Sequence, residues 1–337
     1  MPQPTTTDAM KLQRTDTDTH LYLDADRPLR ILQLTDIHLG CGLFCRYNDR
    51  LALSAVERLV QAADADFCII TGDLAYPFVT LGGSHNNRKP FQLIADIMRR
   101  HHLPWTAVFG NHDTEPHARY TKEQLADFML ADDNCYFAKG PADLTGMGNY
   151  CIPVHTADGK LIMALMMLDS NAYLTKSFFS GFDVIHQDQV DWYVNTIHAM
   201  SEGEPLPSLA FFHIPPKEIR TAWEHIYHGR ADLATYHLGF VQEKDNYFGY
   251  AKTLEGTFFP EMVRLGSCKG MFFGHDHLNT LSVTYQGIRM TYGMSIDYFA
   301  YPGMLERHTQ RGATIIEVHA DTTFDVRMLP LDDLPAE

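Results

Sequence analysis

Two histidines close a short apolar stretch in the last third of the chain. Residues 271–277 read MFFGHDH, so His275 and His277 follow three apolar residues and a glycine. Neutral imidazoles are common ligands of zinc, iron and related ions. Because residues two apart in extended backbone point to the same side, we expect both imidazoles to face one site. The pattern indicates a metal-binding strand end.

Four other apolar stretches end in residues of the same kind. A single histidine or GD pair carries little information, because most such residues are packed or solvated. The signal is the ordered series, in which each member follows an apolar run. The candidate metal ligands at the five endings are Asp36 and His38, then Asp73, then Asn111, then His213, and finally His275 and His277.

The number and type of these side chains indicate two metal ions rather than one. The set holds two carboxylates, one amide and four imidazoles, which is too many for one ion but suits two ions that share a carboxylate. Mixed nitrogen and oxygen ligands favour iron, manganese or zinc. Two metals about 3.5–4 Å apart stabilise in-line attack at phosphorus. The series therefore predicts a dinuclear centre for phosphoester chemistry.

Strands and helices that alternate along the chain must position these residues. The expected strands are 29–38, 66–73, 105–113, 208–216 and 269–277, with hairpins at 149–170 and 312–329. The expected helices are 48–64, with Asn48 or Asp49 as N-cap, 91–102, 121–130, with a Thr-x-x-Gln capping box, and 187–201. Ligands gather beyond the carboxyl ends of strands in α/β folds, so one pocket would collect all five endings.

Composition narrows the classes of partner and location. The 337 residues carry a formal net charge of −15, which opposes binding to nucleic acid or to acidic membranes. We find no apolar run of about 18–20 residues and no N-terminal apolar segment, so we expect a cytoplasmic protein. Residues 1–19 should be a disordered tail and 20–337 a single domain. Six cysteines without a CxxC pair are expected to be reduced thiols.

The ordered motifs resemble those of the calcineurin-like metallophosphoesterase superfamily, namely D-x-H, GD, GNH, a later H and GHxH. The resemblance implies an αββα sandwich of two mixed β-sheets flanked by helices. It also implies one metal ion on Asp36, His38, Asp73 and His277, and a second on Asp73, Asn111, His213 and His275. His112 would be the catalytic residue, as general acid or transition-state stabiliser.

A narrower resemblance is to the branch related to purple acid phosphatases, carried by GDLAY at 72–76, FHIPPKE, GHDHLN and IHQDQVDWY. In the purple enzymes of that branch the tyrosine ligates ferric iron and replaces the histidine of D-x-H. This chain has both His38 and Tyr76. We expect His38 to be the ligand, with Tyr76 nearby or packed.

The implied reaction is attack of a metal-held hydroxide on a phosphate ester. Asp113 either orients His112 or caps the following helix. A phosphomonoesterase acting on a small phosphorylated metabolite or a phosphoprotein is the leading hypothesis. The alternatives are a phosphodiesterase for cyclic nucleotides or other small diesters, and a non-catalytic scaffold. Loop 75–91 and a segment at 214–269 that could cap the site are the expected determinants of substrate.

Overall fold

Two mixed β-sheets form the centre of the computed structural model, which describes residues 11–14, 19–24, 26–175 and 181–335. The five-stranded sheet runs in the order β14 (Phe324–Pro330), β13 (Gly312–Val318), β3 (Leu29–Leu34), β4 (Phe67–Thr71) and β5 (Trp105–Val108). The nine-stranded sheet runs in the order β1 (Lys11–Arg14), β2 (Thr19–Tyr22), β6 (Tyr150–His155), β7 (Leu161–Met167), β8 (Ser208–Phe211), β10 (Cys268–Phe273), β12 (Ile288–Tyr292), β11 (Ser282–Tyr285) and β9 (Ala234–Leu238).

Each sheet combines parallel and antiparallel neighbours. In the smaller sheet β3, β4 and β5 are parallel, and β13 joins β3 antiparallel. In the larger sheet β7, β8, β10 and β12 are parallel, whereas β6 and β11 join them antiparallel. Most residues of the parallel strands are buried because both faces of each sheet are covered.

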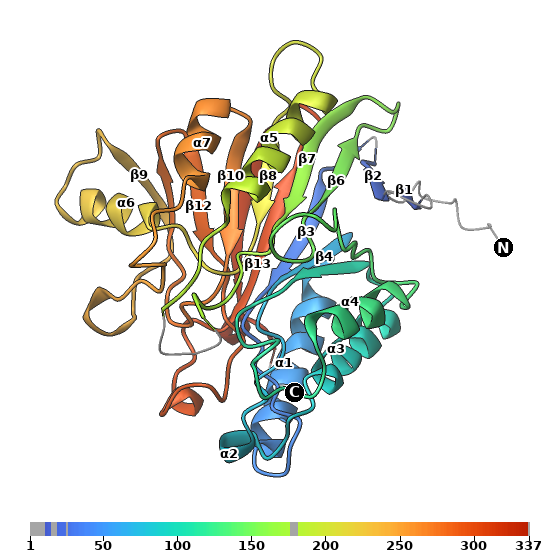
Figure 1. Ribbon diagram of the computed structural model, residues 1–337, viewed down its shortest axis with the longest axis vertical. Helices are drawn as coiled ribbons and strands as arrows, with labels where there is room; N and C mark the ends of the chain where they lie inside the picture. Colours follow the sequence, from blue (N-terminus) through green and yellow to red (C-terminus); the bar gives the residue numbers. More distant parts are fainter. Residues whose placement is uncertain (1–10, 15–18, 25, 176–180, 336–337) are drawn as a thin grey trace.

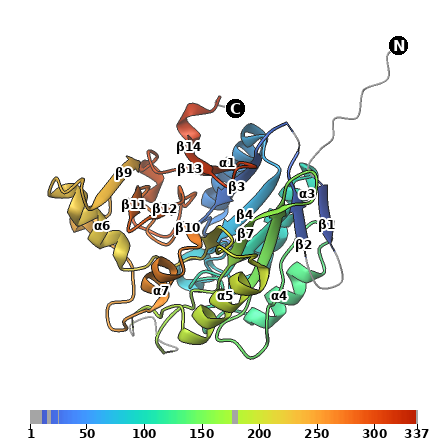
Figure 2. The ribbon, with the colours of Figure 1, turned by 90° about the horizontal axis from the view of Figure 1, so that it is seen from above.

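Helices flank the sheets in two groups (Figures 1 and 2). The group beside the five-stranded sheet is α1 (Arg46–Ala63), α3 (Arg88–Arg100) and α4 (Lys122–Leu130), with the short α2 (Val79–Gly82) at one end. The group beside the nine-stranded sheet is α5 (Gln187–Met200), α6 (Glu218–Tyr227) and α7 (Phe258–Leu265). The described part of the chain also contains short 3-10 helices at Lys244–Asn246, Met304–Glu306 and Leu331–Asp333. The predicted α/β sandwich of two mixed sheets is confirmed.

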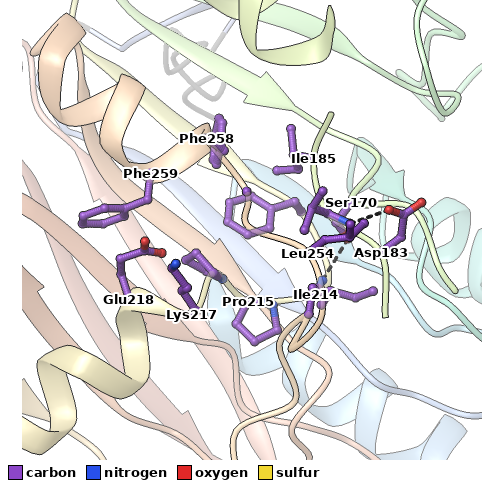
Figure 3. Close-up of a pocket in the computed structure, with 15 residues that line it drawn as sticks. Ser170, Asp183, Ile185, Ile214, Pro215, Lys217, Glu218, Leu254, Phe258 and Phe259 are labelled. Atoms are coloured by element: carbon purple, nitrogen blue, oxygen red, sulfur yellow. Dashed lines mark hydrogen bonds between the residues drawn. The ribbon is translucent and has the colours of Figure 1, made fainter. Parts of the chain in front are cut away.

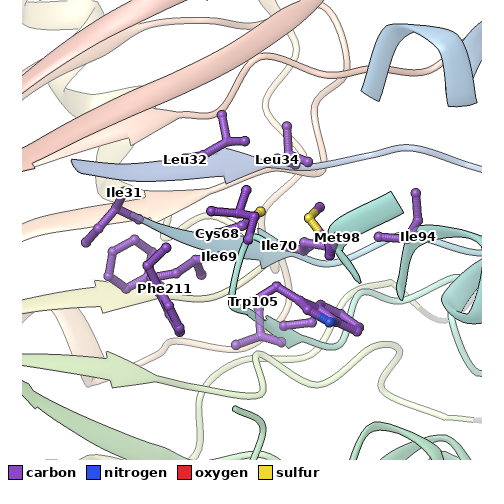
Figure 4. Close-up of a cluster of buried hydrophobic side chains, with 14 of the residues drawn as sticks. Ile31, Leu32, Leu34, Cys68, Ile69, Ile70, Ile94, Met98, Trp105 and Phe211 are labelled. Atoms are coloured by element: carbon purple, nitrogen blue, oxygen red, sulfur yellow. The ribbon is translucent and has the colours of Figure 1, made fainter. Parts of the chain in front are cut away.

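The main core lies between the sheets. Figure 4 shows Ile31 and Ile69 from the smaller sheet next to Phe211 from the larger one, and all three are fully buried. The ring of Phe211 also stacks on Phe272, with 5.1 Å between centroids. Full burial of one such side chain contributes about 1.5–3 kcal/mol. This packing holds the ends of strands from both sheets at fixed positions.

The sequence predicted most elements but misplaced several ends. Both hairpins form, as β6–β7 and β13–β14, and Thr121 and Gln124 make the expected capping box of α4. Helix α1 begins two residues early, with Cys45 at its N-cap, because the Asp49 carboxylate accepts from the backbone N–H groups of Gly40 and Cys41 instead. Within the expected disordered tail, residues 11–14 form β1, which pairs with β2; residues 1–10 and 15–18 lie outside the described part.

None of the helices in the described part of the chain combines the length and the apolar character that a bilayer-spanning segment needs.

Candidate metal centre

The ends of five strands meet between the two sheets. Asp36 and His38 follow β3, Asp73 follows β4, and Asn111 follows β5 of the smaller sheet. His213 follows β8, and His275 and His277 follow β10 of the larger sheet. All seven side chains are buried. Residues that are up to 241 positions apart in the sequence therefore share one site because the sheets pack face to face.

The ligand atoms fall into two overlapping groups. One group comprises Asp36, His38, Asp73 and His277, and the other comprises Asp73, His213 and His275; within each, the atoms lie within 4.8 Å of one another. Asp73 belongs to both groups. Its Oδ2 lies 3.3 Å from Nε2 of His38 and 3.0 Å from Nε2 of His213.

The amide of Asn111 adds an oxygen to the second group. Its Oδ1 lies 3.2 Å from Nε2 of His213. In the first group, Nε2 of His277 lies 3.5 Å from Oδ1 of Asp36. The structure thus brings together every side chain that the sequence predicted as a ligand.

The backbone at these residues is not the extended chain that we expected. Strand β3 ends at Leu34, and Asp36 and His38 have φ angles of 51° and 52°. Asp73 and His275 are also left-handed, with φ of 52° and 79°. The i, i+2 argument was therefore wrong, and the side chains converge because of sharp turns. Such conformations cost about 1–3 kcal/mol each and are typical of functional sites.

Buried polar atoms without partners support a cation at this position. Both ring nitrogens of His38 and Oδ2 of Asp73 are buried and, among the described residues, make no hydrogen bond of acceptable geometry. An unsatisfied buried polar group costs about 1–3 kcal/mol, and more when it is charged. A metal ion would accept the lone pair of one ring nitrogen of His38 and of Oδ2 of Asp73, so the residues present fit a bound metal. Nitrogen and oxygen donors suit iron, manganese or zinc.

Charges within the cluster are strongly coupled. Burial raises the pKa of Asp73, but His213 and His112 outweigh this effect and hold the pKa well below the ordinary value. Burial lowers the pKa of His213, yet Asp73 and Asp36 raise it overall to about 10. For His275 burial dominates, with help from His213, and its pKa is lowered. The field of the two aspartates therefore favours positive charge at the centre.

Hydrogen bonds to residues outside the ligand cluster fix the orientation of two of its imidazoles. Nδ1 of His213 lies 2.8 Å from the carbonyl oxygen of Thr71, which leaves Nε2 for the cluster. Nδ1 of His277 lies 2.9 Å from Oδ2 of Asp297. Partners of this kind hold a metal-binding histidine in one tautomer. Sequence reasoning missed Asp297, since no motif surrounds it, and its only local signal is a carboxylate shortly after an apolar strand.

His112 lies at the edge of the cluster and is partly exposed. Its backbone N–H donates to Oδ1 of Asp73 at 2.8 Å, and its Nδ1 lies 2.7 Å from Oε1 of Glu115. The ring is close to that of His38, with 5.5 Å between centroids. Glu115 was not predicted from the sequence, although a carboxylate three residues after the histidine was a readable signal.

Asp113 has neither of the two roles expected for it. Its Oδ2 accepts from the backbone N–H groups of Asp73 at 3.0 Å and Gly110 at 2.8 Å, and its Oδ1 accepts from Ala75 at 3.0 Å. Burial and the nearby Asp73 raise its pKa to about 7. Asp113 therefore joins the turns after β4 and β5.

Tyr76 belongs to an aromatic group beside the cluster. Its ring lies 5.3 Å from that of His38 and 5.0 Å from that of His112, and it also contacts Phe78 and Phe299. Burial raises the pKa of its phenol to about 12. The ring contacts on several sides favour the packed role.

The two loops expected to select substrate differ in their contacts. In loop 75–91, Arg88 lies over the rings of Phe128 and Tyr120. In the segment 214–269, α6 packs on β9 and β11 at the edge of the larger sheet. Two parts of the segment approach the centre: the N–H of Gly249 donates to the Asp276 carboxylate at 3.0 Å, and Oε1 of Glu243 accepts from the backbone N–H of Leu278 at 3.1 Å. A cap formed by the whole segment stays a prediction.

A small apolar pocket of about 50 Å³ lies beside the turn that carries His213 (Figure 3). Ile185, Ile214, Pro215 and Phe258 are among its lining residues. Ser170, also in its wall, accepts at Oγ from the backbone N–H groups of His213 at 3.3 Å and Ile214 at 2.9 Å. The pocket therefore lies next to Ser170, which holds the backbone of the candidate ligand His213.

Residues 29–279 match the model of the protein family described as calcineurin-like phosphoesterase. "Probable inactive purple acid phosphatase 29" of Arabidopsis thaliana is 26% identical over 311 residues, covering 83% of this chain and 75% of that protein. "Phosphatase DCR2" of Saccharomyces cerevisiae is 27% identical over 298 residues, covering 82% of this chain and 47% of that longer protein. A dimetal phosphatase from Danio rerio shares the fold, with a TM-score of 0.54 at 11% identity, over 91% of this chain and 97% of that one.

Proposed function

Because this chain belongs to the calcineurin-like phosphoesterase family, we propose that it is an active metal-dependent phosphoesterase that prefers phosphate monoesters. The observation that carries the proposal is the pair of buried ligand groups that share Asp73, with His112 at their edge. The substrate would be a small phosphorylated metabolite or a phosphoprotein.

In this proposal Asp36, His38, Asp73 and His277 hold one ion, and Asp73, Asn111, His213 and His275 hold the other. The ions would be iron, manganese or zinc, as the donor set indicates. Two bound ions would lower the pKa of a water molecule and neutralise charge on the phosphoryl oxygens. The unpartnered atoms of His38 and Asp73 support this assignment.

His112 would act on the leaving group. Its backbone is held by Asp73 and its Nδ1 by Glu115, so the ring lies at a fixed position next to the cluster. The partly exposed ring is accessible to a substrate, unlike the seven buried ligands. A proton donor at this position typically accelerates a reaction by about 10²–10⁴-fold.

The names of the relatives point both ways on activity. The yeast relative is named as a phosphatase, which supports phosphatase activity. The Arabidopsis relative is named as probably inactive. In this chain the ligand groups and the His112–Glu115 pair are all in place, which supports an active enzyme rather than a scaffold.

The test compares hydrolysis of p-nitrophenyl phosphate with that of bis-p-nitrophenyl phosphate by protein loaded with manganese, iron or zinc. We expect a higher kcat/KM for the monoester. His112→Ala should lose about 10²–10⁴-fold in kcat, as expected for a lost proton donor. His198→Ala, at an exposed position of α5, should retain full activity. A higher kcat/KM for the diester would show that the protein is a phosphodiesterase and not a monoesterase. Inactivity of protein with two metals bound would favour a non-catalytic scaffold.

A further inference from the structure

The carboxylate of Glu115 faces two different parts of the centre. Its Oε1 lies 2.7 Å from Nδ1 of His112 and accepts from the hydroxyl of Tyr173 at 2.9 Å. That hydroxyl in turn accepts from Nδ2 of Asn111 at 3.0 Å. Glu115 is only 5% exposed although it belongs to no predicted ligand set. We propose that Glu115 and Tyr173 are positioning residues, which together direct the proton of His112 and the ligand oxygen of Asn111.

The directions of these hydrogen bonds follow from the carboxylate. An ionised carboxylate only accepts, so Nδ1 of His112 and the hydroxyl of Tyr173 must both donate to it. A tyrosine phenol is protonated at neutral pH and donates its O–H to the carboxylate. The lone pairs of the phenol oxygen then accept from Nδ2 of Asn111. One acceptor thereby sets the direction of every bond in the network.

The network has two arms, and the first, the hydrogen bond between Glu115 and Nδ1 of His112, orients the ring of His112. With Nδ1–H bound to Glu115, the other nitrogen, Nε2, has no hydrogen-bond partner among the residues that the structure describes. As an attacking water oxygen bonds to phosphorus, the ester P–O bond breaks and its electron pair stays on the leaving oxygen, which takes the proton from Nε2. The ring is left neutral, with the remaining proton on Nδ1 and still donated to Glu115. This arm rests on the proposed function, because it concerns the departure of the leaving group.

The second arm, which runs from Glu115 through Tyr173 to Asn111, sets the orientation of the Asn111 amide. Since Nδ2 is held by Tyr173, Oδ1 turns to the opposite side, where it lies 3.2 Å from Nε2 of His213 and next to the second ligand group. Without the phenol oxygen, the amide would lose the bond that selects this orientation. Loss of such an outer partner typically lowers metal affinity about 10–100-fold. This arm does not depend on turnover.

Glu115→Gln and Tyr173→Phe separate the two arms. Activity is measured on aryl phosphates whose leaving phenols have increasing pKa, and Mn²⁺ affinity is measured by titration calorimetry on the metal-depleted full chain. Glu115→Gln should lose about 10²-fold on phenyl phosphate, at the low end for a proton donor, and much less on p-nitrophenyl phosphate. Tyr173→Phe should lower Mn²⁺ affinity about 10–100-fold and keep the wild-type dependence on the leaving group.

Controls and a double variant make the result specific. Glu261→Gln, whose carboxylate pairs with Arg264 on α7, and Tyr236→Phe, at an exposed position of β9, should behave as wild type in both measurements. Adding Glu115→Gln to His112→Ala should cause little further loss, because residues that act through one another are not additive. Additive losses, or an unchanged leaving-group dependence in Glu115→Gln, would overturn the first arm.

The second arm fails if Tyr173→Phe binds Mn²⁺ as tightly as wild type. A wild-type protein that binds Mn²⁺ but hydrolyses no substrate would instead refute the proposed function, and the calorimetric comparison would still decide the role of Tyr173.

Discussion

The carboxylate of Asp113 accepts a hydrogen bond of 3.0 Å from the backbone N–H of Asp73, which lies 40 residues earlier in the chain. It accepts two more from Gly110 and Ala75, so one side chain holds the turns after β4 and β5 together. Both turns carry candidate ligands. The position of Asp73 between the two ligand groups therefore depends on a residue that reaches neither group itself.

Replacement of this carboxylate should cost both stability and activity. Asp113→Asn puts an NH₂ group against a backbone N–H, and a buried unsatisfied donor costs about 1–3 kcal/mol. We expect the free energy of unfolding in urea to fall by that amount and turnover to fall with it, because Asp73 shifts. Asp133→Asn, at an exposed position, is the control. Unchanged stability would show that these hydrogen bonds are dispensable.

Stability should depend on pH differently with and without metal. Despite burial, Asp73 raises the pKa of His213 to about 10, and the hydrogen bond that His277 donates to Asp297 raises the pKa of His277 to about 9. The raised values stabilise the metal-free fold fully below the ordinary histidine pKa of about 6.5, and this stabilisation is lost as pH rises toward the folded pKa values. A bound metal ion displaces these protons.

We therefore expect the Tm of chelator-treated protein to fall from near neutral pH toward pH 9, relative to that of metal-loaded protein. Differential scanning calorimetry in both states gives the comparison. His213→Ala should reduce the difference between the two profiles. Parallel profiles would contradict the assignment of these histidines to the metal centre.

His38 and Tyr76 can be separated by loading the protein with ferric iron. We expect Tyr76→Phe to keep both metals and His38→Ala to lose one, because His38 is in a ligand group while Tyr76 packs against Phe78 and Phe299. The wild-type protein should lack the visible band of an iron-bound tyrosinate. A coloured protein that bleaches in Tyr76→Phe would reverse the two roles.

Gly110 should not tolerate a side chain. A Cβ there would lie 2.1 Å from Oδ1 and 2.4 Å from the backbone N of Asp73, well inside van der Waals contact. Gly110→Ala should therefore displace Asp73, lower the metal content below two per chain and abolish most turnover. Gly256→Ala is the matched control, since its Cβ would meet Val184 at an ordinary 3.6 Å. Metal analysis after gel filtration measures the difference, and equal metal content in both variants would contradict it.

Local properties of the sequence were sufficient to identify the candidate ligands and the strands that precede them. Largely apolar runs such as 29–34, 67–71 and 268–273 mark buried strands, and a ligand-type residue stands two positions after the end of each run. The order of these endings also indicated the family, which the match over residues 29–279 confirms. Both features are written in consecutive residues, so they need no knowledge of how distant segments pack.

Tertiary structure alone decided how the ligands are aimed and supported. The left-handed turns at Asp36 and His38 arise where β3 ends early, which the apolar pattern does not mark. Asp297 and Tyr173 reach their partners only because distant strand ends converge, whereas Glu115 lies three residues after His112 and is the local exception. Carboxylates and tyrosines occur throughout the chain, and spacing in sequence does not say which of them will face an imidazole. That choice is made by the packing of the two sheets, whose buried side chains set the distances.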